Sequence, residues 1–103
     1  MKIIYRPERD SLELPGILYA LGDPVRLTIV TRLASKGELT CGIAYPDLIP
    51  KSTLSHHLKI LREAGVIHVR QQGREYHNSL RRDDLEARFP GLLRTIVDVA
   101  VPR

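Results

Sequence analysis

The sequence predicts a mainly α-helical domain that contains one β-hairpin. Apolar residues recur at helical spacing in several stretches, and Gly and Pro residues mark the boundaries between these stretches. Two runs with strand-like composition flank a turn-forming segment at residues 71–74. A chain of 103 residues is long enough for about one domain with a modest core. We therefore expect a single domain over residues 1–103.

The beginning of the chain predicts an arm followed by two helices. Residues 1–11 mix charged side chains and prolines with few apolar residues, so we expect an arm of uncertain order. Two helices are then expected over residues 12–34, separated near Gly22. Asp23 suits the N-cap of the second helix and Pro24 its first position. This helix, ending near residue 34, would bury Leu27, Ile29, Val30 and Leu33.

A short strand and a short helix are expected next. Residues 38–42 could pair briefly as a strand. Tyr45 precedes Pro46, which disfavours a helix at Tyr45, so we place a short helix near residues 46–49. With the helix that follows, residues 38–65 would form a helix-turn-helix.

Residues 51–64 predict the best-defined helix of the chain. Pro50 suits its N-terminus, and Gly65 suits a left-handed C-terminal cap. Ser and Thr crowd the first turn, although they are poor helix formers, because their side chains compete with the backbone. Such a turn suits close approach to a DNA major groove, where short polar side chains and free N–H groups meet phosphates and base edges. The alternative is an ordinary amphipathic surface helix. Its apolar stripe is Leu54, Leu58 and Leu61.

The last third of the chain predicts a hairpin and further helices. Residues 66–70 and 75–80 have the composition of strands, and Gly73 makes a positive φ inexpensive in the turn between them. Helical segments are expected over residues 83–101, beginning with an Asp as cap and interrupted at Pro90 and Gly91. The last segment carries an apolar face too large to leave in water, made by Leu92, Leu93, Ile96, Val97 and Ala100.

Positive charge is concentrated in one part of the chain. The net charge is +4, but residues 51–82 alone carry seven Lys and Arg against two Glu, which leaves the remainder at −1. Basicity confined to one stretch is typical of a protein with a polyanionic partner.

The predicted order of helices, helix-turn-helix, basic hairpin and C-terminal helices is that of a winged helix. The chain resembles the ArsR/SmtB family of bacterial winged-helix repressors over roughly residues 14–100. This resemblance implies a homodimer, joined through the first and last helices, that binds a near-palindromic operator in double-stranded DNA and is released by a small-molecule or redox inducer. The matching segments are residues 20–27, 38–40, 52–67 and 73–76.

The DNA-facing residues are expected on helix 51–64 and on the hairpin, or wing, at residues 66–80. Ser55 and His56 are expected to meet bases, whereas His57 lies near the leucine stripe and is expected to be half-buried packing. For the hairpin, the alternative is a charged turn that is merely solvated. The predicted set is Lys51, Ser52, Thr53, Ser55, His56, Lys59, Arg70, Gln71 and Arg74.

Two apolar faces predict the dimer independently of the resemblance, because together they exceed what one small core can hide. Pairing two chains across them would place two copies of helix 51–64 about one DNA turn apart, ~34 Å. The alternative is that both faces pack onto the core of one monomer. The predicted interface is Leu14, Ile17, Leu18, Leu21, Phe89, Leu92, Leu93, Ile96, Val97 and Ala100.

The sequence argues against a metal site and a cofactor. Many family members bind metals through a Cys-x-Cys pattern or through the last helix, but this chain has only Cys41 and no His after residue 83. Cys41 is either a buried thiol or a redox switch. A single Cys excludes an intrachain disulfide, and no apolar run approaches the roughly 18 residues of a membrane span, so we expect a cytoplasmic protein.

The leading hypothesis is therefore a sequence-specific DNA-binding regulator, acting as a repressor. The alternative is a winged-helix interaction module whose basic face binds an acidic protein. An enzyme is not expected, because no nucleophile–base set, no paired carboxylates in a plausible pocket and no phosphate-binding Gly loop is present.

Overall fold

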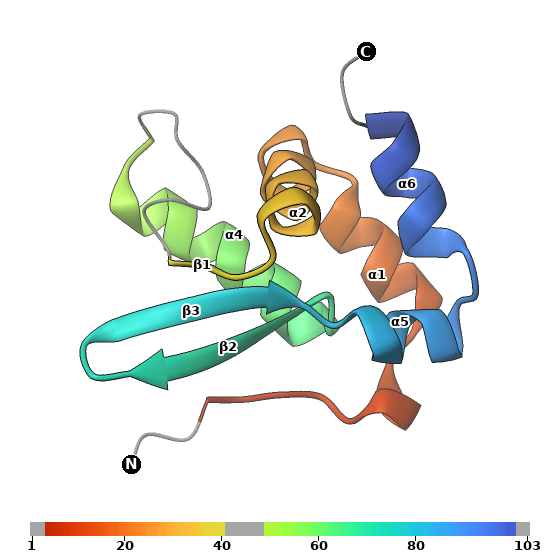
Figure 1. The fold of residues 1–103 in the computed structure, drawn as a ribbon, viewed down its shortest axis with the longest axis horizontal. Coiled ribbons are helices and arrows are strands. Elements are labelled where there is room, and N and C mark those ends of the chain that lie inside the picture. Colours follow the sequence, from red (N-terminus) through yellow and green to blue (C-terminus); the bar gives the residue numbers. More distant parts are fainter. Residues whose placement is uncertain (1–3, 41–48, 101–103) are drawn as a thin grey trace.

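The computed structural model describes residues 4–40 and 49–100 and confirms the mainly α-helical class with a β-hairpin. Figure 1 shows most of the helices above a small sheet, with the N-terminal arm running below that sheet. Residues 41–48 lie outside the described ranges. They include Cys41, the end of the predicted strand at residues 38–42, and all of the predicted helix at residues 46–49 except Ile49. The described elements are η1 (Arg9–Ser11), α1 (Leu14–Leu21), α2 (Pro24–Lys36), β1 (Leu39–Thr40), α4 (Lys51–Ala64), β2 (Ile67–Gln72), β3 (Glu75–Leu80), α5 (Arg82–Arg88) and α6 (Leu92–Ala100).

The N-terminal arm is docked against α5, which the sequence did not predict. Arg81 donates from Nη1 to the carbonyl of Pro7 at 2.8 Å, and Arg9 donates from Nε to the Asp84 carboxylate at 2.6 Å. Leu12, expected at the start of a helix, instead lies before α1 in an extended conformation and is buried in the core. These contacts join residues more than 70 positions apart, and local composition carries no information about them.

Helix α2 begins where the sequence predicts and ends two residues later than predicted. The Asp23 carboxylate accepts hydrogen bonds from the N–H groups of Val25 at 2.9 Å and Arg26 at 3.1 Å, which confirms its role as N-cap. The helix runs on to Lys36, and Gly37 follows with a φ of 88°. Leu27, expected in the core, is only partly buried, and Arg26 is buried instead.

The sheet has three antiparallel strands in the order β1-β3-β2. Leu39 of β1 pairs with Asn78 of β3, so the short strand after α2 joins the hairpin. Gln72 pairs with Glu75, which makes the turn two residues long rather than the predicted four. Gln71 and Gln72 therefore continue β2. Gly73 has the predicted positive φ, at 61°.

The predicted Asp cap of the helix after the hairpin is wrong. Helix α5 starts at Arg82, and the residue in the N-cap position is Arg81, whose side chain makes no capping hydrogen bond. Asp84 lies in the first turn, where it accepts hydrogen bonds from Arg9 and Arg81 rather than from the backbone. The Arg9 guanidinium is the main reason that the pKa of Asp84 lies below its ordinary value.

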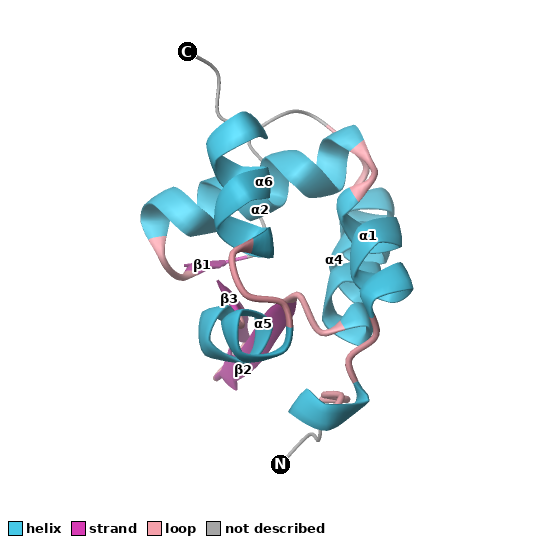
Figure 2. Ribbon diagram, turned by 90° about the vertical axis from the view of Figure 1, so that its right-hand side faces the viewer, coloured by secondary structure: helices cyan, strands magenta, loops and turns pink. Residues whose placement is uncertain are grey.

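One core holds the layers together. Helix α1 packs against α4, and α2 packs against α6 and β3. Figure 2 shows α1 and α4 side by side, with α6 and α2 next to each other and α5 beside the sheet. The largest fully buried apolar side chains come from the arm, from α1, α2 and α4, and from the start of β2 with the residue before it. They are Leu12, Ile17, Ile29, Val30, Leu33, Leu61, Val66 and Ile67.

Candidate nucleic-acid interface

Helix α4 has the ends that the sequence predicts. Pro50 precedes it and accepts a hydrogen bond at its carbonyl from the N–H of Leu54 at 3.0 Å, but it has no side chain to cap the helix. At the other end, Gly65 adopts a left-handed φ of 90°, and the Val66 N–H donates to the Leu61 carbonyl at 2.9 Å. The helix start therefore presents backbone N–H groups and a partial positive charge.

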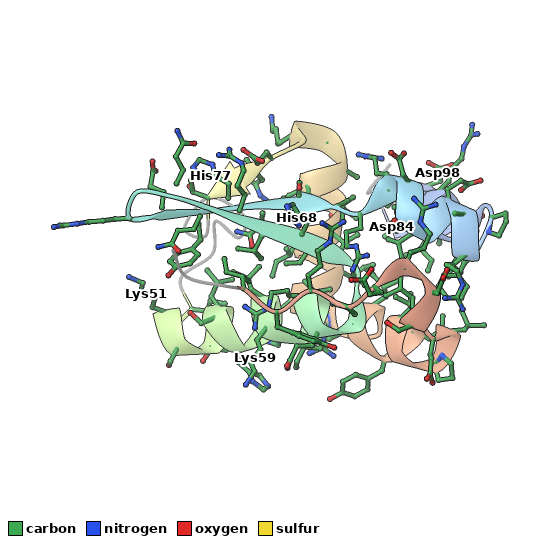
Figure 3. The ribbon with its side chains drawn as sticks, turned by 90° about the horizontal axis from the view of Figure 1, so that it is seen from below. Lys51, Lys59, His68, His77, Asp84 and Asp98 are labelled. Atoms are coloured by element: carbon green, nitrogen blue, oxygen red, sulfur yellow. The ribbon has the colours of Figure 1, made fainter. Side chains whose placement is uncertain are left out.

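The two faces of α4 differ in the predicted way. Leu54, Leu58 and Leu61 are buried and fix the helix against the core. The polar side of the helix faces outward, and Figure 3 shows Lys51 and Lys59 projecting from it. The exposed residues are Lys51, Ser52, Thr53, Ser55, His56 and Lys59, all of which belong to the predicted DNA-facing set.

The hairpin turn lies at the same end of the molecule as the start of α4. Figure 1 shows both at the left, and Figure 3 shows the same arrangement from below. Arg70, Gln71 and Arg74 are exposed. The structure thus places the start of α4 and the turn of the wing at one end of the molecule.

Arg70 is held by an acidic partner that the sequence analysis missed. Its Nη2 donates to the Glu38 carboxylate at 2.7 Å, and its Nη1 donates to the Gln72 side chain at 2.7 Å. The hydrogen bond from Arg70 is the main cause that lowers the pKa of Glu38. His77 Nδ1 lies 3.4 Å from the same carboxylate. Glu38 thus links the strand after α2 to the middle of the wing and partly neutralises its charge.

A buried arginine joins α4 to the two helices before it. Arg26 is only 7% exposed, and its Nε donates to the Ala20 carbonyl at 2.7 Å while Nη2 donates to the Tyr19 carbonyl at 3.1 Å. Its Nη1 lies 3.2 Å from Nδ1 of His57. The sequence did contain a signal for burial, because Arg26 lies on the same helical stripe as the buried Ile29, but apolar patterns do not single out an arginine.

His57 is less exposed than its neighbour His56, as expected for a residue beside the leucine stripe. Its side chain is 12% exposed, and Nδ1 lies 3.8 Å from the Asp23 carboxylate. The pKa of Asp23 is lowered, chiefly by the hydrogen bond from the Arg26 N–H. His57 therefore lies between α4 and the N-cap of α2, and it makes a polar contact as well as packing.

The predicted dimer residues divide into three groups by burial. Ile17, Leu21 and Leu93 are buried in the core of one chain, so they do not belong to an uncovered face. Leu14 and Leu18 remain 42% and 47% exposed on α1. The others are partly buried, and Phe89, Leu92, Ile96 and Val97 pack against the core.

The described part of the chain lacks both a metal-binding cluster and a membrane-spanning helix. Residues 4–40 and 49–100 contain no group of three or more His, Cys, Asp or Glu placed to hold a metal ion. None of the helices within these ranges is both long and apolar enough to cross a membrane.

Comparisons with known proteins agree with this geometry. A family model described as a helix-turn-helix domain matches residues 21–70. The HTH-type transcriptional regulator YceK of Bacillus subtilis is 42% identical over 82 residues, which cover 78% of this chain and 82% of YceK. The HTH-type transcriptional repressor SmtB of Mycobacterium tuberculosis is 37% identical over 67% of this chain, which spans only 52% of the repressor.

Solved structures extend the likeness to the whole fold. The transcriptional repressor BigR of Xylella fastidiosa has a TM-score of 0.66 at 27% identity, covering 87% of this chain and 88% of BigR. An ArsR family transcriptional regulator, RHA00566, has a TM-score of 0.67 at 26% identity, covering 86% of this chain and 98% of that one.

Proposed function

The chain belongs to the ArsR/SmtB family of helix-turn-helix transcriptional regulators, and on this premise we propose that it is a dimeric repressor that reads its operator with the first turns of α4. The family is one of transcription regulators rather than of enzymes. One observation carries the proposal. The exposed Ser, Thr, His and Lys side chains at the start of α4 lie at the same end of the molecule as the basic hairpin turn.

The proposed division of labour follows from side-chain length and position. Ser55 and His56 are exposed within the first two turns of α4, where they would meet base edges in a major groove. Lys51 and Lys59 would neutralise phosphates on either side of that groove. Arg74 at the wing turn would contact the neighbouring backbone or minor groove, where Arg is favoured.

The proposed dimer uses α1 and the C-terminal helices. Leu14 and Leu18 leave an apolar surface on α1 that one chain does not cover, and Val99 on α6 is 79% exposed. Covering such surfaces with a second copy by two-fold symmetry would present two α4 helices to half-sites ~34 Å apart. The buried positions Ile17, Leu21 and Leu93 would support this interface from beneath without entering it.

The proposal is tested by selecting bound sequences from random duplexes and measuring their affinity by gel shift across salt concentrations. We expect a near-palindromic site whose affinity falls steeply as salt rises. Replacing Ser55 and His56 together by Ala should remove the preference for that site while leaving most nonspecific binding. The matched control is Glu63→Ala, which changes an exposed α4 residue far from the first turn. Wild-type protein that binds no duplex at any salt concentration would contradict the proposal, and nuclease-resistant capture of an acidic protein would favour the interaction-module alternative.

A further inference from the structure

The buried guanidinium of Arg26 links three helices through one rigid group. Two of its nitrogens bind the carbonyls of Tyr19 and Ala20, which lie in the last turn of α1, and a third faces His57 on α4. The Tyr19 ring packs on the guanidinium, with the Arg26 Cζ 5.2 Å from the ring centroid. Because a guanidinium is planar and its donors have a fixed geometry, these partners determine one another's positions. A flexible side chain would not constrain them in this way.

The contact with His57 determines which imidazole nitrogen carries the proton. Arg only donates hydrogen bonds, so the 3.2 Å contact between Nη1 and Nδ1 requires Nδ1 to accept. A neutral His57 then carries its proton on Nε2. The Asp23 carboxylate, 3.8 Å from Nδ1, lies too far away to form a hydrogen bond with it. Arg26 is therefore the hydrogen-bond partner of Nδ1.

We propose that Arg26 and His57 are positioning residues for DNA reading, because they fix the orientation of α4 relative to α1. This inference rests on the proposed function, since it assigns α4 to the operator and α1 to the dimer. A two-fold dimer sets the separation of its reading helices through the angle between these two elements. Burial of Leu54, Leu58 and Leu61 holds α4 against the core, but the hydrophobic effect is not directional. The Arg26–His57 hydrogen bond adds the directional constraint at the second turn of α4, beside Ser55 and His56.

The chain offers variants that separate positioning from stability. Arg26→Met removes every side-chain donor yet keeps an unbranched side chain of similar length, and it costs stability because the Tyr19 and Ala20 carbonyls lose their arginine partner. His57→Ala removes the acceptor at a half-buried position. His57→Asn keeps an acceptor, because the Asn amide oxygen can occupy the place of Nδ1. The control is Arg88→Met, because Arg88 also donates to a backbone carbonyl, that of Arg9 at 2.7 Å, but it lies on α5.

The first experiment needs no DNA. Residual dipolar couplings of the backbone amides in the free protein measure the orientation of α4 relative to α1. In Arg26→Met and His57→Ala, we expect α4 to take a different orientation relative to α1 or to sample several orientations. His57→Asn and Arg88→Met should retain the wild-type orientation. The imidazole nitrogen shifts of wild-type His57 should show the Nε2-protonated tautomer. An unchanged orientation of α4 in folded Arg26→Met and His57→Ala would overturn the inference. A wild-type His57 that carries its proton on Nδ1 would overturn it too. If Arg26→Met does not fold, the two His57 variants decide.

The second experiment measures the ratio of affinities for the selected operator and for a scrambled duplex of equal length, at one salt concentration. We expect this ratio to fall about tenfold in Arg26→Met and in His57→Ala, which is the size of effect for a lost hydrogen bond to a charged group. The double variant should fall no further, and His57→Asn should stay within about twofold of wild type. Equal ratios in all variants would overturn the inference. Absence of operator binding by the wild type would instead refute the proposed function, while the dipolar couplings would still decide the helix orientation.

Discussion

Gly65 is the position where one added methyl group tests the junction between α4 and the wing. Its φ of 90° lies in the left-handed region, and a Cβ built on it would overlap the Cδ2 methyl of Leu12 and lie 3.3 Å from Leu12 Cγ. Leu12 is fully buried, so neighbouring core side chains must shift if Leu12 moves away from the new methyl group. Gly65→Ala should therefore disturb both the helix cap and the docking of the N-terminal arm.

The expected loss of stability has two parts. An L-residue in the left-handed conformation costs roughly 1–2 kcal/mol, and overpacking a filled core costs typically about 1–3 kcal/mol. We expect Gly65→Ala to lower the free energy of unfolding by about 2–5 kcal/mol. Gly73→Ala is the matched control, because Gly73 also has a positive φ of 61° but no heavy atom within 4 Å of its added Cβ. Only the conformational part, roughly 1–2 kcal/mol, applies there.

Urea unfolding at one fixed protein concentration measures both variants, because stability and any dimerisation are linked. The double variant Leu12→Ala/Gly65→Ala tests the overlap directly. Leu12→Ala alone should cost about 2–5 kcal/mol, and the double variant should cost less than the sum of the two single changes, because the new methyl group occupies space that Leu12 vacates. Equal stability losses in Gly65→Ala and Gly73→Ala, together with additive costs in the double variant, would refute the reasoning.

Three further predictions concern the wing, the dimer and the arm. Arg74→Ala should reduce the slope of log affinity against log salt by about 1, as expected for one lost phosphate contact, whereas Arg94→Ala on α6 should leave it unchanged; anisotropy titrations that show equal slopes would count against wing contact. Leu18→Glu should give monomers in sedimentation experiments, because the carboxylate would be buried in the proposed interface, and a surviving dimer would place that interface elsewhere. Asp84→Asn should lower stability at pH 7. Since the pKa of folded Asp84 is depressed, its contribution is present above about pH 4 and is lost as pH falls through the folded pKa, so the unfolding free energies of variant and wild type in urea should converge once the pH lies below the folded pKa.

Local signals were sufficient to predict the helix that carries the candidate interface. The leucine stripe, Pro50 and Gly65 predicted α4 with the bounds that the structure shows. Each of these signals acts within one or two turns of the chain, so no knowledge of the tertiary structure was needed. The exposure of Ser55 and His56 followed from the same periodicity.

Features that depend on distant residues were not predicted. The arm is ordered by contacts with Arg81 and Asp84. Asp84 does not cap α5, because its carboxylate accepts hydrogen bonds from Arg9 and Arg81 instead. The wing turn is shorter than predicted, because Gln72 pairs across the hairpin although its side chain is not typical of a strand. Arg26 was missed for a related reason, since only the assembled helices supply the carbonyls that make its burial tolerable.

Chemical-shift mapping of the isotope-labelled protein with its selected duplex tests the DNA-reading surface most directly. The amide signals that change most should be those of residues 51–59 and 70–74. The same titration with Ser55→Ala/His56→Ala should lose the changes that are specific to the selected duplex. Changes confined to α5 and α6, or identical changes with a scrambled duplex, would contradict the assignment of α4 as the helix that reads DNA.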